Sequence, residues 1–191
     1  MKLGALSLLF GVITVQAAAG QSPTTPSEAF LLRISELHTT LKPTAGPNNV
    51  GNCMIVYPDG RLHLELRRQE FFSGPASFVS YEGNLSIHEL TSLRSILDSD
   101  AVRSLQAVHP PSAPMDADDH GWFTAEIWRP TKMQTVGTVY GAGPKNTEDD
   151  ARAWREAGVV LQPLIEWSHL VKSFDLSELR RIPNANSVCG Q

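Results

Sequence analysis

The most regular pattern in the sequence is the alternation of leucine with polar residues in RLHLELRR, residues 61–68. One side of an extended chain would carry Leu62, Leu64 and Leu66, and the other side Arg61, His63, Glu65 and Arg67. Alternation of this kind is typical of a β-strand with one buried face and one polar face. The preceding residues, CMIVY and then PDG, indicate another strand and a tight turn, because proline and glycine supply the backbone angles of such a turn. We therefore predict a β-hairpin that begins at Cys53.

Three more segments alternate in a similar way and predict strands. They are SFVSYEG at 77–83, GWFTAEIWR at 121–129 and MQTVGTVYG at 133–141. The segment at 30–41 is open to two interpretations, because FLLRIS could be a short strand, whereas a helical stripe would be formed by Phe30, Ile34, Leu37 and Leu41.

The sequence NLSIHEL, residues 84–90, carries the signature of a helix N-terminus. Ser86 can cap the amide of Glu89, and Glu89 can reach back to the amide of Ser86. Leu85 can pack on Leu90 across this box, and the helix that follows has one apolar stripe, formed by Leu90, Leu93, Ile96 and Leu97. The next residues, DSDAVRSLQ, predict a short turn or helix.

Two further helices are predicted near the end of the chain. Thr147 begins the first, with acidic residues in its first turn, and Gly158 ends it. Pro163 lies in the first turn of the second. The apolar residues of this second helix are spaced by three and four positions: Leu164, Trp167, Val171 and Phe174.

This order of elements predicts an α+β fold. Short connections between strands and helices segregated from them favour an antiparallel sheet of about five strands with helices packed on one face. We assign residues 53–191 to this single α+β domain. Residues 20–52 are a partly disordered lead-in that contains the uncertain element.

The first 19 residues have the features of a signal peptide. Lys2 supplies a positive charge, Leu3 to Val15 form a short apolar run, and small residues follow at positions 17–19. We predict cleavage near Gly20 and a secreted or periplasmic protein with no transmembrane segment after the leader is removed. Removal of Lys2 changes the formal net charge from −4 to −5. This mild acidity, without a basic stripe, excludes nucleic acid as a partner.

The chain contains two cysteines, Cys53 and Cys189. In an exported protein, a disulfide is the natural interpretation of such a pair. It would join the first strand of the hairpin to the last three residues. The alternative is two free thiols.

Two sets of residues are candidate metal ligands, although the sequence predicts no cofactor. Asp116, Asp118 and Asp119 could form a loose site for calcium or another divalent cation, but His120 and Ile127 stand where an EF-hand needs oxygen ligands. The alternative is a solvated, aspartate-rich turn. His63 and Glu65 have the spacing at which a strand can present two ligands to zinc, with His120 as a third. The alternative there is a charged outer strand face.

The tryptophans suggest a binding surface. Trp122 and Trp128 would leave one face of the strand at 121–129, with Glu126 between them, and Phe123, Ala125 and Ile127 would leave the other. The tryptophan face is either covered by a helix or open to a sugar ring or a peptide. Trp154 and Trp167 lie on helical apolar stripes and are predicted to be buried.

Taken together, VYPDGRLHLELRR, YEGNLSIHELTSLRSIL, TAEIW and LQPLIEW resemble small secreted bacterial proteins of unknown function. This resemblance spans most of residues 53–172 and implies an exported α+β domain with one disulfide. The order of elements is also similar to that of emfourin-type inhibitors of thermolysin-like peptidases. That similarity implies inhibition of a peptidase and identifies no inhibitory residues.

Common catalytic motifs are missing from the sequence: no serine lies in GxSxG, and GAGPKNT does not have the spacing of a phosphate-binding loop. The leading hypothesis is therefore an exported, non-enzymatic binding protein for a protein or saccharide ligand, with peptidase inhibition as one form of it. The alternatives are a carbohydrate-binding module and a metal-dependent hydrolase that uses the histidines and aspartates named above.

Overall fold

The computed structural model describes residues 29–40, 49–69, 75–107, 119–141, 148–172, 179–182 and 187–189. The predicted signal peptide and most of the lead-in lie outside these residues. The elements, in chain order, are β1 (Leu32–Thr40), β2 (Asn49–Val56), β3 (Arg61–Gln69), β4 (Ser77–Asn84), α1 (Ile87–Asp98), α2 (Asp100–Ser104), β5 (Asp119–Trp128), β6 (Met133–Gly141), α3 (Glu148–Lys172) and β7 (Arg180–Ile182).

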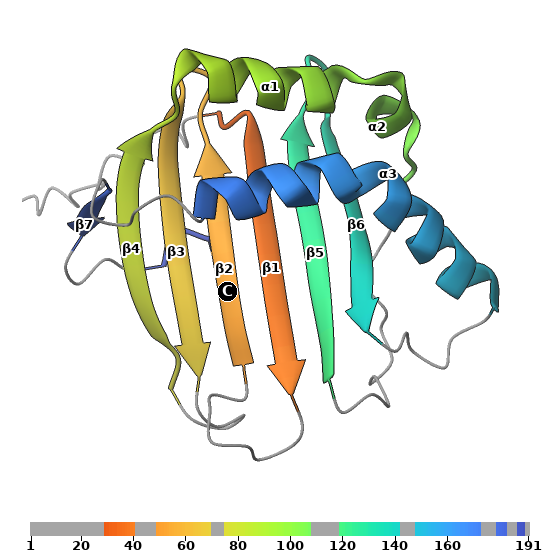
Figure 1. Cartoon of the computed structure of the whole chain (residues 1–191), viewed down its shortest axis with the longest axis horizontal. Coiled ribbons are helices and arrows are strands. Elements are labelled where there is room, and N and C mark those ends of the chain that lie inside the picture. The colour runs from red at the N-terminus through yellow and green to blue at the C-terminus, as the bar shows by residue number, and fades with distance from the viewer. Residues whose placement is uncertain are drawn as a thin grey trace, which may run out of the picture.

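The strands form one antiparallel sheet in the order β6-β5-β1-β2-β3-β4-β7 (Figure 1). The predicted class, an antiparallel sheet combined with helices, is confirmed, but the sheet has seven strands rather than five. Within the segment at 30–41 that was open between helix and strand, Leu32–Thr40 forms β1. It pairs with β2 on one side and with β5 on the other, so neighbours distant in sequence supply the hydrogen bonds that its local sequence did not specify.

The main core lies between the sheet and the helices. The leucine face of β3 is buried there, as predicted, next to residues 0 % exposed from the neighbouring strands and from the helices: Leu32, Ile34, Met54, Leu93, Leu161 and Leu164. The predicted burial of Trp154 and Trp167 is also confirmed. Burying apolar side chains stabilises the fold by about 25 cal/mol per Å2 of apolar surface removed from water.

The helices do not lie on the sheet as predicted. In Figure 1, α3 crosses in front of the strands, whereas α1 runs along their upper ends. Arg94 of α1 donates a hydrogen bond of 2.9 Å to the carbonyl of Pro58, in the turn between β2 and β3. Gly60 of the same turn has a φ of 90°, a conformation that glycine adopts without strain.

The two helices predicted near the end of the chain are one helix, α3. Gly158 was expected to end the first helix, but it lies inside α3, as does Pro163. A Cβ atom at residue 158 would lie 2.9 Å from Oγ1 of Thr138. Glycine therefore serves close packing of α3 on β6 at this position, and it does not terminate the helix.

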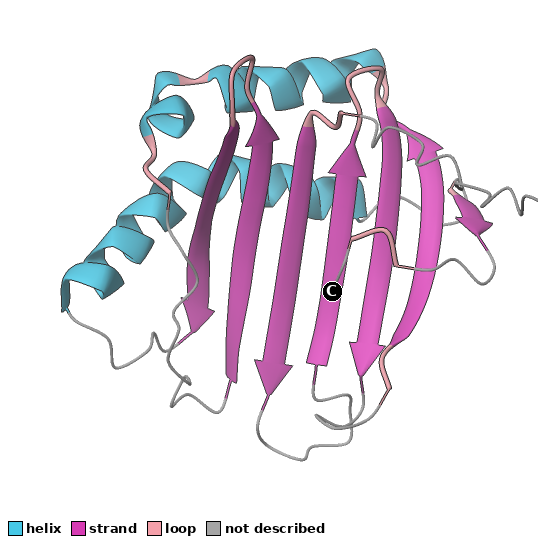
Figure 2. Cartoon of the chain, turned by 180° about the vertical axis from the view of Figure 1, so that it is seen from behind, coloured by secondary structure: helices cyan, strands magenta, loops and turns pink. Residues whose placement is uncertain are grey.

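The end of the chain lies on the face of the sheet opposite the helices (Figure 2). Cys189 forms the predicted disulfide with Cys53 of β2. Both cysteines are buried with Ile55 in a second, smaller apolar cluster that also contacts Phe30 and Tyr57. One face of the sheet is therefore crossed by α3, and the other is partly covered by residues 187–189.

Among the described helices, none has the length and apolar character needed to cross a membrane.

Candidate functional site

His63 and Glu65 form a buried pair on β3, on the face of the sheet opposite the helices. They are 6 % and 2 % exposed, and Nε2 of His63 lies 3.2 Å from Oε1 of Glu65. Glu65 also accepts a hydrogen bond of 2.8 Å from the hydroxyl of Ser187 and another from the backbone amide of Val188. The carboxylate is thus surrounded by donors from the end of the chain, so its observed contacts hold residues 187–189 on the sheet.

The structure does not bring His120 or Asp119 to this pair. His120 and Asp119 lie at the start of β5, and two strands, β1 and β2, separate β5 from β3. Asp116 and Asp118 lie outside the described residues. Within the described part of the chain, histidine, cysteine, aspartate and glutamate side chains form no group of three or more that could hold a metal ion.

The tryptophan face of β5 points away from the helices. Phe123, Ala125 and Ile127 occupy the core side, as the alternation predicted. On the outer side, Glu126 accepts a hydrogen bond of 2.6 Å from Nε of Arg33 on β1.

The two tryptophans lie far apart on the outer side of β5. They are six residues apart on an extended strand, a separation of roughly 20 Å. Trp122 is partly exposed, whereas Trp128 is 49 % exposed at the end of the strand.

A cavity of about 730 Å3 lies beside Trp128. It is framed by the end of α1, by α2 with the residues that follow it, and by the turn between β5 and β6. Its apolar lining comes from Leu31, Leu97, Leu105, Ile127, Trp128 and Met133. Its charged lining comes from Arg94, Asp98, Arg103, Arg129 and Lys132. A volume of this size matches a small organic ligand.

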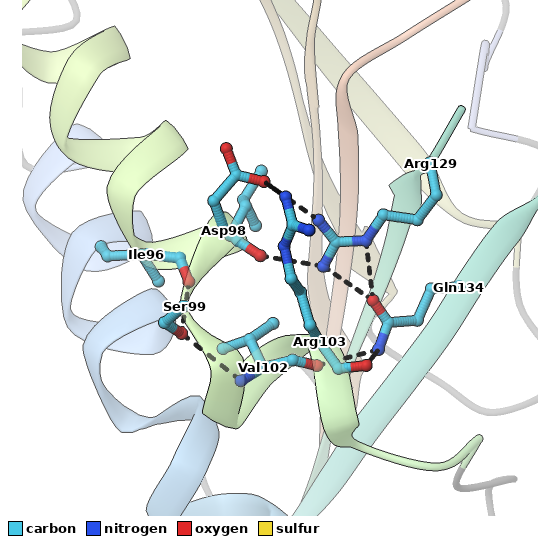
Figure 3. Close-up of polar contacts among 8 residues, drawn as sticks. Ile96, Asp98, Ser99, Val102, Arg103, Arg129 and Gln134 are labelled. Carbon is cyan, nitrogen blue, oxygen red and sulfur yellow. Dashed lines mark hydrogen bonds and ion pairs between the residues drawn. The ribbon is translucent and has the colours of Figure 1, made fainter. Parts of the chain in front are cut away.

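Acceptors from α1 and β6 surround the guanidinium group of Arg129 in the wall of the cavity (Figure 3). Its Nη2 atom donates to the carbonyl of Leu97, at the end of α1, at 2.9 Å. Both Nε and Nη2 donate to Oε1 of Gln134 on β6, at 2.9 and 2.7 Å. The amide of Gln134 in turn donates to the carbonyls of Val102 at 2.8 Å and Leu105 at 3.2 Å. These bonds join the β5–β6 turn to both helices, so the wall of the cavity is held in one arrangement.

The cavity is positively charged. Four cationic side chains and one acidic side chain line it, in a protein whose formal net charge is −4. Burial lowers the pKa of Arg129, the guanidinium of Arg103 lowers it further, and Asp98 opposes both effects. An arginine keeps its charge at neutral pH even so. Repulsion between the two guanidinium groups means that an added anion would be stabilised here.

The sequence identified one residue of this cavity as a candidate, Trp128, and it did not identify the charged residues that line the cavity. The cationic residues come from α1, α2 and the β5–β6 turn, separated along the chain by stretches that carry no motif. The one local signal is that Arg129 directly follows the aromatic end of a predicted strand, and that signal does not indicate which helices face it.

No protein-family model matches the chain, and no curated protein matches it in sequence.

Proposed function

We propose that this protein is an exported, non-enzymatic binding protein whose ligand is a small organic anion held in the cavity beside Trp128. The observation that carries the proposal is the fixed guanidinium of Arg129 in the wall of a cavity with an excess of positive charge. Charge-assisted hydrogen bonds from arginine are the strongest that side chains offer to a carboxylate or phosphate.

The apolar lining indicates the rest of the ligand. Trp128, which is 49 % exposed, lines the same cavity as Leu105 and Met133. Aromatic rings and aliphatic chains gain the most binding free energy from such a surface, because binding removes their apolar area from water. The proposed ligand therefore has one anionic group and an apolar body.

Titration of the purified protein with naphthoate, monitored by isothermal calorimetry and by tryptophan fluorescence, tests this proposal. We expect binding of naphthoate and no binding of the neutral naphthamide. The variant Arg103→Gln should weaken naphthoate binding by about five- to tenfold, the effect of losing one partly exposed charged donor. The matched control, Arg155→Gln, alters an exposed arginine of α3 that does not line the cavity and should bind as the wild type does.

Two results would reject the proposed function. One is the absence of naphthoate binding at millimolar concentration by the folded protein. The other is equal loss of affinity in Arg103→Gln and Arg155→Gln, which would indicate a general charge effect. Tryptophan fluorescence that responds to a neutral polysaccharide and is indifferent to Arg103→Gln would favour the carbohydrate-binding alternative.

Export is part of the same proposal. The disulfide between Cys53 and Cys189 supports it, because such bonds form and persist in oxidising compartments. Protein recovered from outside the cytoplasm should begin near Gly20 when its N-terminus is sequenced. Recovery of the intact N-terminus from the cytoplasm alone would reject export.

A further inference from the structure

The acidic residue of the cavity, Asp98, already occupies a position between two of its arginines. Oδ1 of Asp98 lies 2.8 Å from Nη2 of Arg103 and 3.5 Å from Nη1 of Arg129 (Figure 3). It is the single acidic side chain among the residues that line the described cavity. The side chains of Asp98 and Arg103 are 58 % and 57 % exposed, whereas that of Arg129 is 15 % exposed.

The position of Asp98 in α1 does not stabilise its negative charge. Asp98 is the last residue of α1, and the last turn of this helix contains no basic residue. A carboxylate at a helix C-terminus faces the negative end of the helix dipole, which is unfavourable. Ser99 satisfies the end of α1, because its backbone amide and its hydroxyl both donate to the carbonyl of Ile96. The contacts with the two arginines offset this unfavourable position of the carboxylate.

We propose that the side chain of Asp98 is an internal competitor that holds the place of a ligand carboxylate, and that an apolar carboxylic acid displaces it on binding. This inference rests on the proposed function and names the anionic group of its ligand. The contact of Asp98 with both guanidinium groups shows that a carboxylate fits between them. The displaced side chain of Asp98 is already more than half exposed, so its rotation toward solvent costs little free energy.

The apolar body of the acid lies in the same cavity. Trp128, Leu105 and Met133 belong to its lining, as Arg103 and Arg129 do. Binding then replaces the ion pairs of Asp98 with ion pairs of the ligand carboxylate. The net gain in free energy therefore comes from the apolar contact. Short carboxylates such as acetate, which lack an apolar body, bind weakly for this reason.

Replacement of the competitor tests this inference. Asp98→Asn keeps the size of the side chain and removes its charge, and we expect it to bind naphthoate about five-fold more tightly than the wild type. Asp100→Asn removes an exposed acid two residues away that does not line the cavity, and it should leave the affinity unchanged. Asp98→Ala, titrated with naphthoate in the same way, checks that the gain in affinity does not depend on the new amide, and thermal unfolding checks that it is folded like the wild type.

Naphthyl phosphate, measured on the same variants, distinguishes the two anions that guanidinium groups accept. Tighter binding of the phosphate than of naphthoate by the wild type would overturn the choice of a carboxylate. Equal naphthoate affinity in the wild type and in Asp98→Asn, or equal gains in Asp98→Asn and Asp100→Asn, would overturn the competition. Either outcome would leave the proposed function in place, whereas failure of every variant to bind naphthoate would reject that function itself.

Discussion

Glu65 shows how the surroundings of one residue change its role. Its position on the polar side of β3 predicted a solvated strand face or a zinc ligand. The structure instead buries it against residues 187–189, with donors from Ser187 and Val188 and with His63 beside it. A buried carboxylate is stable only when such donors replace the water that it has lost. Its removal should therefore cost more than the removal of an exposed carboxylate.

We predict that Glu65→Ala lowers the free energy of unfolding by about 1–3 kcal/mol, because it leaves donors without their acceptor and removes contacts from a packed site. The matched control is Glu82→Ala on β4, whose partner Arg180 is largely exposed. Loss of that surface pair should cost less than about 1 kcal/mol. Urea unfolding of the two variants measures both values. Equal costs would mean that the contacts of Glu65 with the end of the chain contribute nothing to stability.

At the scale of elements, the contact between α3 and β6 explains why one long helix forms where two were predicted. Gly158 has a weak helix propensity, so its presence indicated an end. The helix continues because Gly158 packs against Thr138 of β6. The hydroxyl of Thr138 donates a hydrogen bond of 2.9 Å to the carbonyl of Trp154 on α3. The packing of α3 on β6 at this point outweighs the local cost of glycine, which is about 1 kcal/mol relative to alanine.

Gly158→Ala should therefore destabilise the protein, although alanine is the better helix former. The new methyl group would meet the Thr138 hydroxyl, which its hydrogen bond holds in place, and overpacking of this kind costs about 1–3 kcal/mol. In the background Thr138→Ala, the same change should become neutral or stabilising, because the obstacle is gone. Thermal unfolding of the wild type, the two single variants and the double variant gives the sign of the stability change in each background. Stabilisation by Gly158→Ala alone would contradict the close contact.

At the scale of the whole molecule, the disulfide joins β2, in the middle of the sheet, to the end of the chain. The two cysteines are 136 residues apart, so the loop that they close contains most of the described fold. In the chain-entropy model, closing so long a loop restricts the unfolded state and stabilises the fold by up to about 5 kcal/mol.

We predict that the double variant Cys53→Ser, Cys189→Ser loses about 2–5 kcal/mol of stability in guanidinium unfolding. Reducing agent should lower the stability of the wild type by a similar amount and leave the double variant unchanged. Thiol titration of the native, non-reduced protein should find no free thiol. Detection of both thiols would show that residues 187–189 are not fastened to the sheet.

The sequence alone determined the features that depend on near neighbours. The hairpin of β2 and β3, with its leucine face inward, follows from alternation and from a turn that Gly60 permits. The start of α1 follows from the capping box of Ser86 and Glu89, whose two reciprocal hydrogen bonds are present in the structure. Both patterns extend over a few residues, and their physical causes act within the same few residues.

Only the tertiary structure decided what distant segments do to one another. Leu32–Thr40 became a strand because β2 and β5 lie on both sides of it. Glu65 left solvent because Ser187 and Val188 cover it, and the arginines of the cavity met because α1, α2 and the β5–β6 turn are joined through Gln134 and Arg129. The energies of such contacts depend on distances in space, and a one-dimensional pattern records those distances only for residues close together in the chain.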